Sequence, residues 1–142
     1  MHRHVLQIVV FVRQEGIQMK KMKKFIVEFG LGTDLHGQNV TKAACKAVKD
    51  AVSRSCLCGL QEILGIADAD FPRRVYIQCT VGVSRPEEVD LEAVASMLPV
   101  GTAEVKAVPG GLVADGVCIR NFGDKEKSVE AAVAAVEVFI RE

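Results

Sequence analysis

Several features that mark common classes of binding protein are missing from this chain of 142 residues. It has no tryptophan and a single tyrosine, Tyr76, so it lacks the aromatic platform on which nucleic-acid bases stack. Its 18 basic residues are balanced by 18 acidic ones, so it also lacks the basic excess that neutralises phosphate groups. The composition therefore predicts that the protein binds no nucleic acid.

A long apolar segment is missing as well. The apolar run Val5–Val12 is far shorter than the roughly 20 residues needed to cross a bilayer, and no small-residue cleavage site of a signal peptide follows it. We therefore expect no membrane partner. We also expect residues 1–21 to be an N-terminal extension outside the fold, followed by a single domain over residues 22–142.

The cysteines form no recognisable framework, because their number is odd and no C-x-x-C pair occurs. This pattern predicts neither a set of disulfides nor a zinc site with four thiolates. We expect reduced thiols in a cytoplasmic protein. The five residues are Cys45, Cys56, Cys58, Cys79 and Cys118.

Two kinds of hydrophobic periodicity predict the secondary structure. Alternation of apolar and polar residues, clearest over 74–83, indicates strands, and apolar residues at three- and four-residue steps, clearest over 40–52, indicate helices. Strands are expected at 24–29, 74–83, 102–108 and 112–121, and helices at about 39–52, 60–66, 90–98 and 126–141. The turn Pro109-Gly110-Gly111 is expected to join the last two strands as a hairpin.

The order of these elements predicts an α+β fold. We expect a single mixed or mostly antiparallel sheet of about four strands, with helices packed on one face. The outward face of the strand at 74–83 is semi-polar, and helices on the other side cannot cover it. An uncovered face and exposed edges favour association, so we expect a homo-oligomer.

The segment Gly30–Gly37, with the sequence GLGTDLHG, is the most unusual part of the chain. We expect a loop between a strand and a helix, where Gly30, Gly32 and Gly37 allow a ligand to come close to the backbone. His36, beside the positive end of the following helix, is a candidate general base, and Asp34 is a candidate to orient it or to accept a proton itself. Equally, Asp34 and His36 can simply hold the loop together through hydrogen bonds.

No cofactor is predicted from this segment. The glycine spacing departs from the G-x-G-x-x-G fingerprint of dinucleotide-binding proteins. A divalent metal held by Asp34 and His36, with Glu28 or Asp124 as a third ligand, is an alternative that the residue types allow.

The segment resembles a motif, G-x-G-x-D-x-H-G, of a family of small uncharacterised conserved hypothetical proteins. The resemblance extends through Val40–Ala44, Ser55–Leu57, Arg85–Asp90 and Gly110–Leu112. It implies the location of a site and no particular activity. The element order is also similar to the trimeric α+β folds of the chorismate-mutase and YjgF type, which implies a trimer with ligands between subunits.

Other residues are candidates for ligand binding. Arg85, at the end of a strand, has the geometry to bind a carboxylate or phosphate, although a salt bridge to Glu87 or Glu88 explains it equally well. Lys42 lies in the first turn of the predicted helix, where its positive charge interacts unfavourably with the helix dipole. This placement suggests a role in binding an anion, and the alternative is an ordinary solvated lysine. The amides of Gly110 and Gly111 are further candidates.

These observations lead to three hypotheses about function. The first is a small-molecule site in which Asp34 and His36 perform acid–base chemistry, such as hydrolysis, isomerisation or elimination, on a small polar metabolite. The second is a ligand-binding or sensor module without catalysis, in which the loop and Arg85 hold an anion. The third is a structural subunit of a homo-oligomer.

Overall fold

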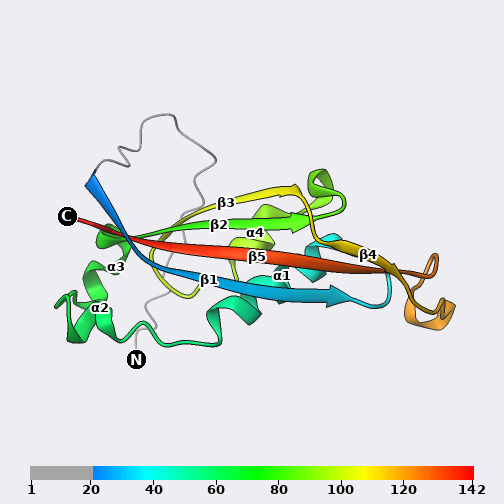
Figure 1. Ribbon diagram of the computed structural model, residues 1–142, viewed down its shortest axis with the longest axis horizontal. Helices are drawn as coiled ribbons and strands as arrows, with labels where there is room; N and C mark the ends of the chain where they lie inside the picture. Colours follow the sequence, from blue (N-terminus) through cyan, green and yellow to red (C-terminus); the bar gives the residue numbers. More distant parts are fainter. Residues whose placement is uncertain (1–20) are drawn as a thin grey trace, which may run out of the picture.

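The last strand of the chain runs along the middle of a five-stranded mixed sheet (Figure 1). The structure is a computed structural model that describes residues 21–142, so the expectations for residues 1–20 lie outside the described residues. The strands are β1 (Met22–Asp34), β2 (Val75–Val83), β3 (Thr102–Pro109), β4 (Leu112–Asp115) and β5 (Ser128–Arg141). This sheet, with helices on one face, confirms the predicted α+β fold class.

β5 organises the sheet because it pairs with three other strands. It is antiparallel to β1 along nearly its whole length, from Met22 opposite Arg141 to Asp34 opposite Glu130. On its other edge it pairs first with β2 and then, beyond the end of β2, with the short β4. β3 lies outside β2 and is parallel to it, so the sheet is mixed.

The helix expected at 126–141 is wrong, since this segment forms β5. Its alanines and valines fit a helical stripe, but they fit a two-residue alternation equally well. Ala132, Ala134, Val136 and Val138 all point to the core and are at most 2% exposed. Pairing on both edges satisfies the backbone of this segment along the sheet, and that tertiary context outweighs the helix propensity of alanine.

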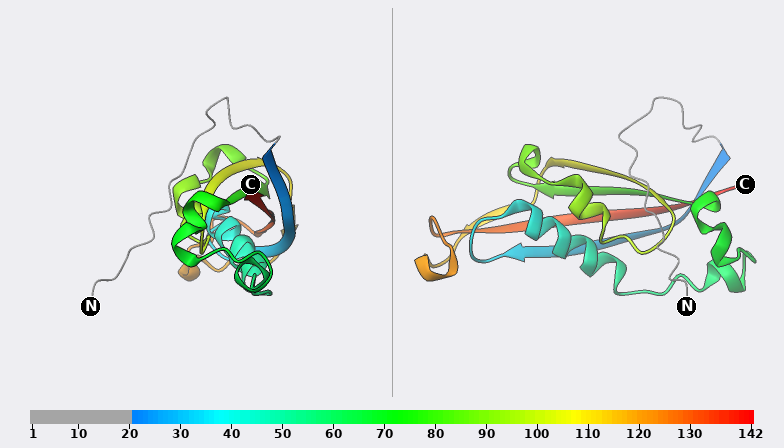
Figure 2. Two further views of the ribbon diagram at one scale, coloured as in Figure 1. Left: turned by 90° about the vertical axis from the view of Figure 1, so that its left-hand side faces the viewer. Right: turned by 180° about the vertical axis from the view of Figure 1, so that it is seen from behind.

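The helices cover one face of the sheet (Figure 2). They are α1 (Val40–Val52), α2 (Gly59–Glu62), α3 (Phe71–Arg74) and α4 (Leu91–Ala95). The predicted helices at 39–52 and 90–98 are confirmed, with Asn39 and Asp90 as side-chain N-caps. Within residues 21–142, no helix is both long and apolar enough to cross a membrane.

Close packing of α1 on β1 explains two of the glycines in the unusual segment. A Cβ added to Gly30 would lie 2.1 Å from the carbonyl oxygen of Ala47, and one added to Gly32 would lie 2.2 Å from that of Ala43. No side chain fits between the strand and the helix at these positions. The expected loop is therefore wrong over residues 30–34, which continue β1 beneath α1.

The expected hairpin at residues 102–121 is also wrong. β3 and β4 belong to one sheet without pairing with each other, because the chain steps from beside β2 to beside β5 at Gly110 and Gly111. Gly111 has a φ of 69°, and a Cβ on it would lie 2.2 Å from the carbonyl oxygen of Ala131. The strand expected to reach residue 121 ends at Asp115.

Candidate functional site

The turn between β1 and α1 is held by the last residue of the strand. The carboxylate of Asp34, which is 5% exposed, accepts a hydrogen bond from the backbone N–H of Asn39 at 2.7 Å. Asn39 in turn caps α1 by accepting a hydrogen bond from the N–H of Lys42. Asp34 thus places the start of the helix, and it makes no hydrogen bond to His36.

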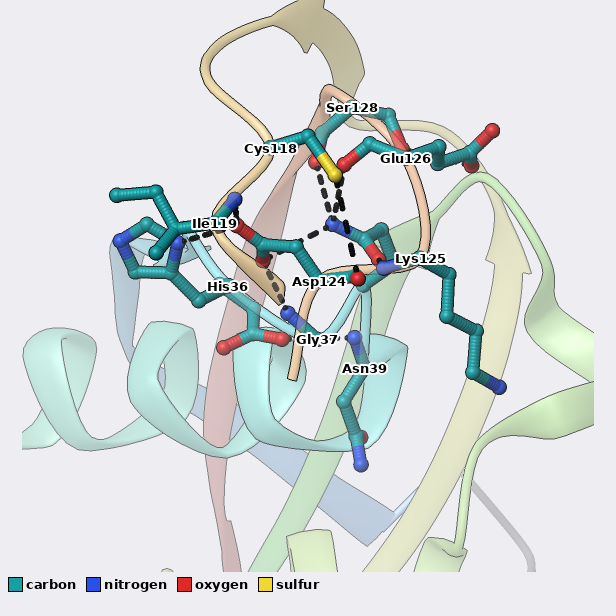
Figure 3. A network of polar contacts seen from close by, with 11 residues as sticks. His36, Gly37, Asn39, Cys118, Ile119, Asp124, Lys125, Glu126 and Ser128 are labelled. Carbon is teal, nitrogen blue, oxygen red and sulfur yellow. Dashed lines mark hydrogen bonds and ion pairs between the residues drawn. The ribbon is translucent and has the colours of Figure 1, made fainter. Parts of the chain in front are cut away.

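His36 is oriented by a different carboxylate, that of Asp124 (Figure 3). Nδ1 of His36 lies 2.7 Å from Oδ2 of Asp124, whose side chain is completely buried, whereas the His36 side chain is 33% exposed. The imidazole also meets the ring of Phe122 edge-on, with 5.0 Å between the ring centroids. The Nε2 atom of His36 points away from this network and has no hydrogen-bond partner within residues 21–142.

Asp124 remains ionised because several donors surround its carboxylate. Backbone N–H groups of Ile119 and Gly37 donate to it at 2.8 and 2.9 Å, and His36 contributes the third short contact. The hydrogen bond from Ile119, followed by that from His36, lowers the pKa of Asp124 to about 2, although burial opposes this shift. The next regular element after Asp124 is the strand β5.

Gln38 completes the connection between the two loops. Its backbone φ of 51° is unusual for a residue other than glycine, and its side chain is almost fully buried. The side-chain amide donates to the carbonyl of Ser128 at 3.0 Å, and its oxygen accepts from the backbone N–H of Lys125 at 3.0 Å. The loop after β1 and the loop before β5 are therefore joined by buried polar contacts.

An open polar pocket lies at the N-terminus of α1, with an empty volume of about 530 Å³ that includes open solvent. It is lined by Gly37, Gln38, Asn39, Val40, Thr41, Arg85, Glu88 and Lys125. The backbone N–H groups of Val40 and Thr41 have no hydrogen-bond partner within the described part of the chain. Together with Arg85 and Lys125 they favour a negatively charged ligand, although Glu88 offsets part of this charge.

Arg85 has two partners at the rim of this pocket. Its guanidinium donates to the carbonyl oxygen of Gln38 at 2.6 Å and forms an ion pair with Glu88 at 2.9 Å. Arg85 therefore forms the salt bridge to Glu88 that was considered as the alternative, and it also lines the pocket, as expected of a ligand-binding residue. The guanidinium is fixed against the same turn that carries His36.

The structure brings only some of the predicted site residues together. Gly37 and Arg85 line the pocket, and His36 adjoins Gly37 without lining it. Lys42 is exposed in the first turn of α1 and does not line the pocket. The remaining candidates lie elsewhere: Gly30 and Gly32 under α1, and Gly110 and Gly111 at the step between β3 and β4.

The alternative of a metal site involves the same residues. Of the two third ligands considered, Asp124 contacts His36, whereas Glu28 accepts a hydrogen bond from Ser55. Within residues 21–142, no group of three or more histidine, cysteine or acidic side chains is arranged to hold a metal ion. A site at Asp34 and His36 therefore stays a prediction.

Sequence reasoning considered Asp124 only as a possible third metal ligand, and it did not identify Gln38 as part of the site. The only local signal at Asp124 is the preceding Gly123, whose φ of 88° makes a sharp turn. The partners of Asp124 at His36 and Gly37 are 88 and 87 residues away, so no local pattern connects them. For Gln38, a buried residue beside Gly37, the sequence carries no distinguishing signal.

A family model described as "Conserved hypothetical protein (Lin0512_fam)" matches residues 24–138. The chain belongs to this family. The match begins within β1 and ends within β5, so it includes the turn after β1, the pocket and the loop that carries Asp124. It bears out the expected membership of an uncharacterised conserved family.

A solved structure of similar fold comes from Nostoc punctiforme. It is the crystal structure of a protein described as FtsZ-like and of unknown function. That protein is 36% identical to this chain, with a TM-score of 0.75 over 85% of this chain and 98% of its own. A search of curated proteins finds no match.

Proposed function

We propose that this member of the family binds a small anionic metabolite and uses His36 as a general base. The observation that carries the proposal is the contact between His36 Nδ1 and the buried, ionised carboxylate of Asp124. An ionised carboxylate only accepts hydrogen bonds, so in the neutral imidazole Nδ1 carries the proton and Nε2 carries the free lone pair. A partly exposed Nε2 held in this way is suited to taking a proton from a substrate.

The pocket beside this histidine supports the class of ligand. Two free backbone N–H groups at the start of α1, with Arg85 and Lys125, suit a carboxylate or a phosphate group. Gly37 connects the two features, since it lines the pocket and its N–H is bonded to Asp124. The chemistry that fits is proton transfer on a small polar metabolite, as in hydrolysis, isomerisation or elimination.

A specific observation favours a second function, ligand binding without catalysis. His36 is not among the residues that line the pocket, so a ligand held there need not touch the imidazole. In that case Asp124 and His36 serve to fix the turn after β1, and the protein is a binding or sensor module. In either function we place the protein in the cytoplasm, since its five cysteines are all free thiols.

Two measurements test the proposal. The first is a thermal-shift screen with small carboxylates, phosphates and divalent metals on the wild type and on Lys125→Met, with Lys127→Met as the matched control. A ligand at a hundredfold excess over its Kd stabilises the protein by about 2.7 kcal/mol. We expect the shift to fall in Lys125→Met and to persist in the control, because Lys127 does not line the pocket. Equal shifts in all three proteins would contradict the proposed pocket.

The second measurement is the tautomer of His36, observed by nitrogen NMR and assigned by comparison with His36→Gln. We expect the neutral imidazole to carry its proton on Nδ1, and we expect this preference to be lost in Asp124→Ala. A neutral imidazole that carries its proton on Nε2 in the wild type would rule out the general-base role. If His36→Gln retains full turnover of a substrate, His36 is not the general base. If the wild type binds a ligand and turns over none of the compounds that bind, the binding function is correct and the catalytic one is wrong.

A further inference from the structure

The face of the sheet opposite the helices carries large apolar side chains that no described element covers. Gly30 and Gly32 of β1 point to α1, so their neighbours in the strand point to the opposite side. Among these, Phe29 is 62% exposed and Leu31 is 57% exposed. Val133 of β5, between two fully buried alanines, is 43% exposed on the same side.

The strand registers assemble these side chains into one patch. Phe29 lies opposite Ala135, which lies opposite Thr80 of β2, and Leu31 lies opposite Val133 and then Gly82. Leu112 of β4, 67% exposed, extends the patch toward the end of the sheet. We define the outer-face patch as Val27, Phe29, Leu31, Leu112 and Val133.

We propose that the outer-face patch is the interface through which two copies of this chain pack sheet against sheet. The outer face has a raised part and a lower part, and these are complementary in shape when two copies meet face to face. β1 forms a ridge of large side chains, Val27, Phe29 and Leu31, and beside it Ala135, Thr80 and Gly82 form a low floor. In an interface with two-fold symmetry, the ridge of each copy rests on the floor of the other.

The size of the face fits a stable dimer. The four adjacent strands β1, β5, β2 and β3 lie about 4.8 Å apart. With roughly eight residues in each strand and a rise of about 3.4 Å per residue, the sheet face covers a flat area of about 500 Å². Projecting side chains make the accessible surface larger, which brings it close to the ~800 Å² per partner of a standard interface. Contiguous exposed apolar patches larger than a few hundred Å² mark interaction sites in soluble proteins.

Charge on the outer face favours a second copy over a polyanionic partner. Lys24 pairs with Glu137 at 2.7 Å, and Glu104 accepts a hydrogen bond from Tyr76 at 2.6 Å. These charged groups lie near the end of the sheet where β1 begins, and the exposed Lys106 of β3 lies beside Thr80 on the same face, so charged groups also border the apolar side chains on the β3 side. Charges of both signs beside an apolar centre are typical of a protein interface with a polar rim.

The test is the mass of the full-length chain in solution, by light scattering and sedimentation equilibrium from about 1 µM to about 100 µM. We expect a dimer for the wild type and a monomer for Phe29→Lys, since docking would bury the new charge without a partner. The matched control is Ile63→Lys, which also adds a lysine at an exposed apolar residue, 81% exposed, near α2. The control should remain dimeric.

The dissociation constant should rise by about 100-fold or more in Phe29→Lys. Far-ultraviolet circular dichroism checks that the variant folds, and Leu31→Gln takes its place if it does not. A wild type that is monomeric throughout, a trimer in place of a dimer, or variants as dimeric as the wild type would overturn the proposal. The dimer proposal is independent of the function proposed for His36, because the variants that test the dimer and the variants that test the function change different residues.

Discussion

Asp124 holds Nδ1 of His36 at 2.7 Å across 88 residues of sequence. This contact joins the turn after β1 to the loop before β5, and backbone N–H groups from both loops converge on the same carboxylate. The turn that forms the candidate site is therefore held in place by hydrogen bonds to a residue near the C-terminal end of the chain. A change at Asp124 is expected to affect both the stability of the fold and the chemistry of His36.

Stability at acid pH tests the role of Asp124. Because its hydrogen bonds lower its pKa to about 2, below the ordinary 3.8, ionised Asp124 stabilises the folded state above about pH 4. That contribution should be lost as the pH falls from about 4 to about 2. We expect Asp124→Asn to be less stable than the wild type at pH 7, with the gap closing over this range in urea unfolding. The exposed Asp115→Asn should show no such gap at pH 7.

Titration of Tyr76 tests the packing at the other end of the sheet. Burial, and then the neighbouring Glu104, raises the pKa of its phenol to about 12 from the ordinary 10.0. A raised pKa means stability that is present below about pH 10 and is lost as the pH rises through about 12. Since the chain has no tryptophan and no other tyrosine, tyrosinate absorbance reports this group alone. Ionisation at about pH 10 in the folded protein would contradict the structure.

A matched variant separates the two causes of this shift. Glu104→Gln removes the nearby negative charge but leaves Tyr76 buried, so the pKa should fall only part of the way toward 10. A complete return to the ordinary value would show that Tyr76 is not buried as described.

Gly32→Ala tests the close approach of α1 to β1. The added methyl group would lie 2.2 Å from backbone atoms of Ala43 and Ala47, which can move only if the helix moves. We expect a loss of about 1–3 kcal/mol in the free energy of unfolding, measured with urea. Gly59→Ala is the control, because its methyl group meets only the ends of the Phe25 and Ile63 side chains and no backbone atom. Equal stability of the two variants would mean that the helix lies farther from the strand.

Thiol labelling tests which cysteines the fold protects. Cys79 is 1% exposed, and burial raises its pKa to about 12, so it should not react until the protein unfolds. Cys56, Cys58 and Cys118 are exposed and should react in the native state. Cys79→Ala should leave native labelling unchanged and remove one thiol from the count in denaturant. Rapid labelling of Cys79 in the native state would contradict its place in the core.

Local periodicity was sufficient to predict β2, α1 and α4, because each contains a pattern that fits one kind of structure only. It failed for β5, where alternating alanines and valines fit a strand and a helix alike. It also placed Gly30 and Gly32 in a loop, since the sequence does not show that a helix will pack on their backbone. His36 was found as a candidate, but its partner was expected at Asp34.

Local patterns within a few residues were enough to predict the fold class, the position of α1 and the turn that carries His36. The central place of β5 in the sheet and the contact by which Asp124 orients His36 became visible only in the folded structure. Strand pairing and buried hydrogen bonds join residues that are far apart in the chain. Their energies depend on which backbone and carboxylate groups meet after folding, and no local pattern contains that information.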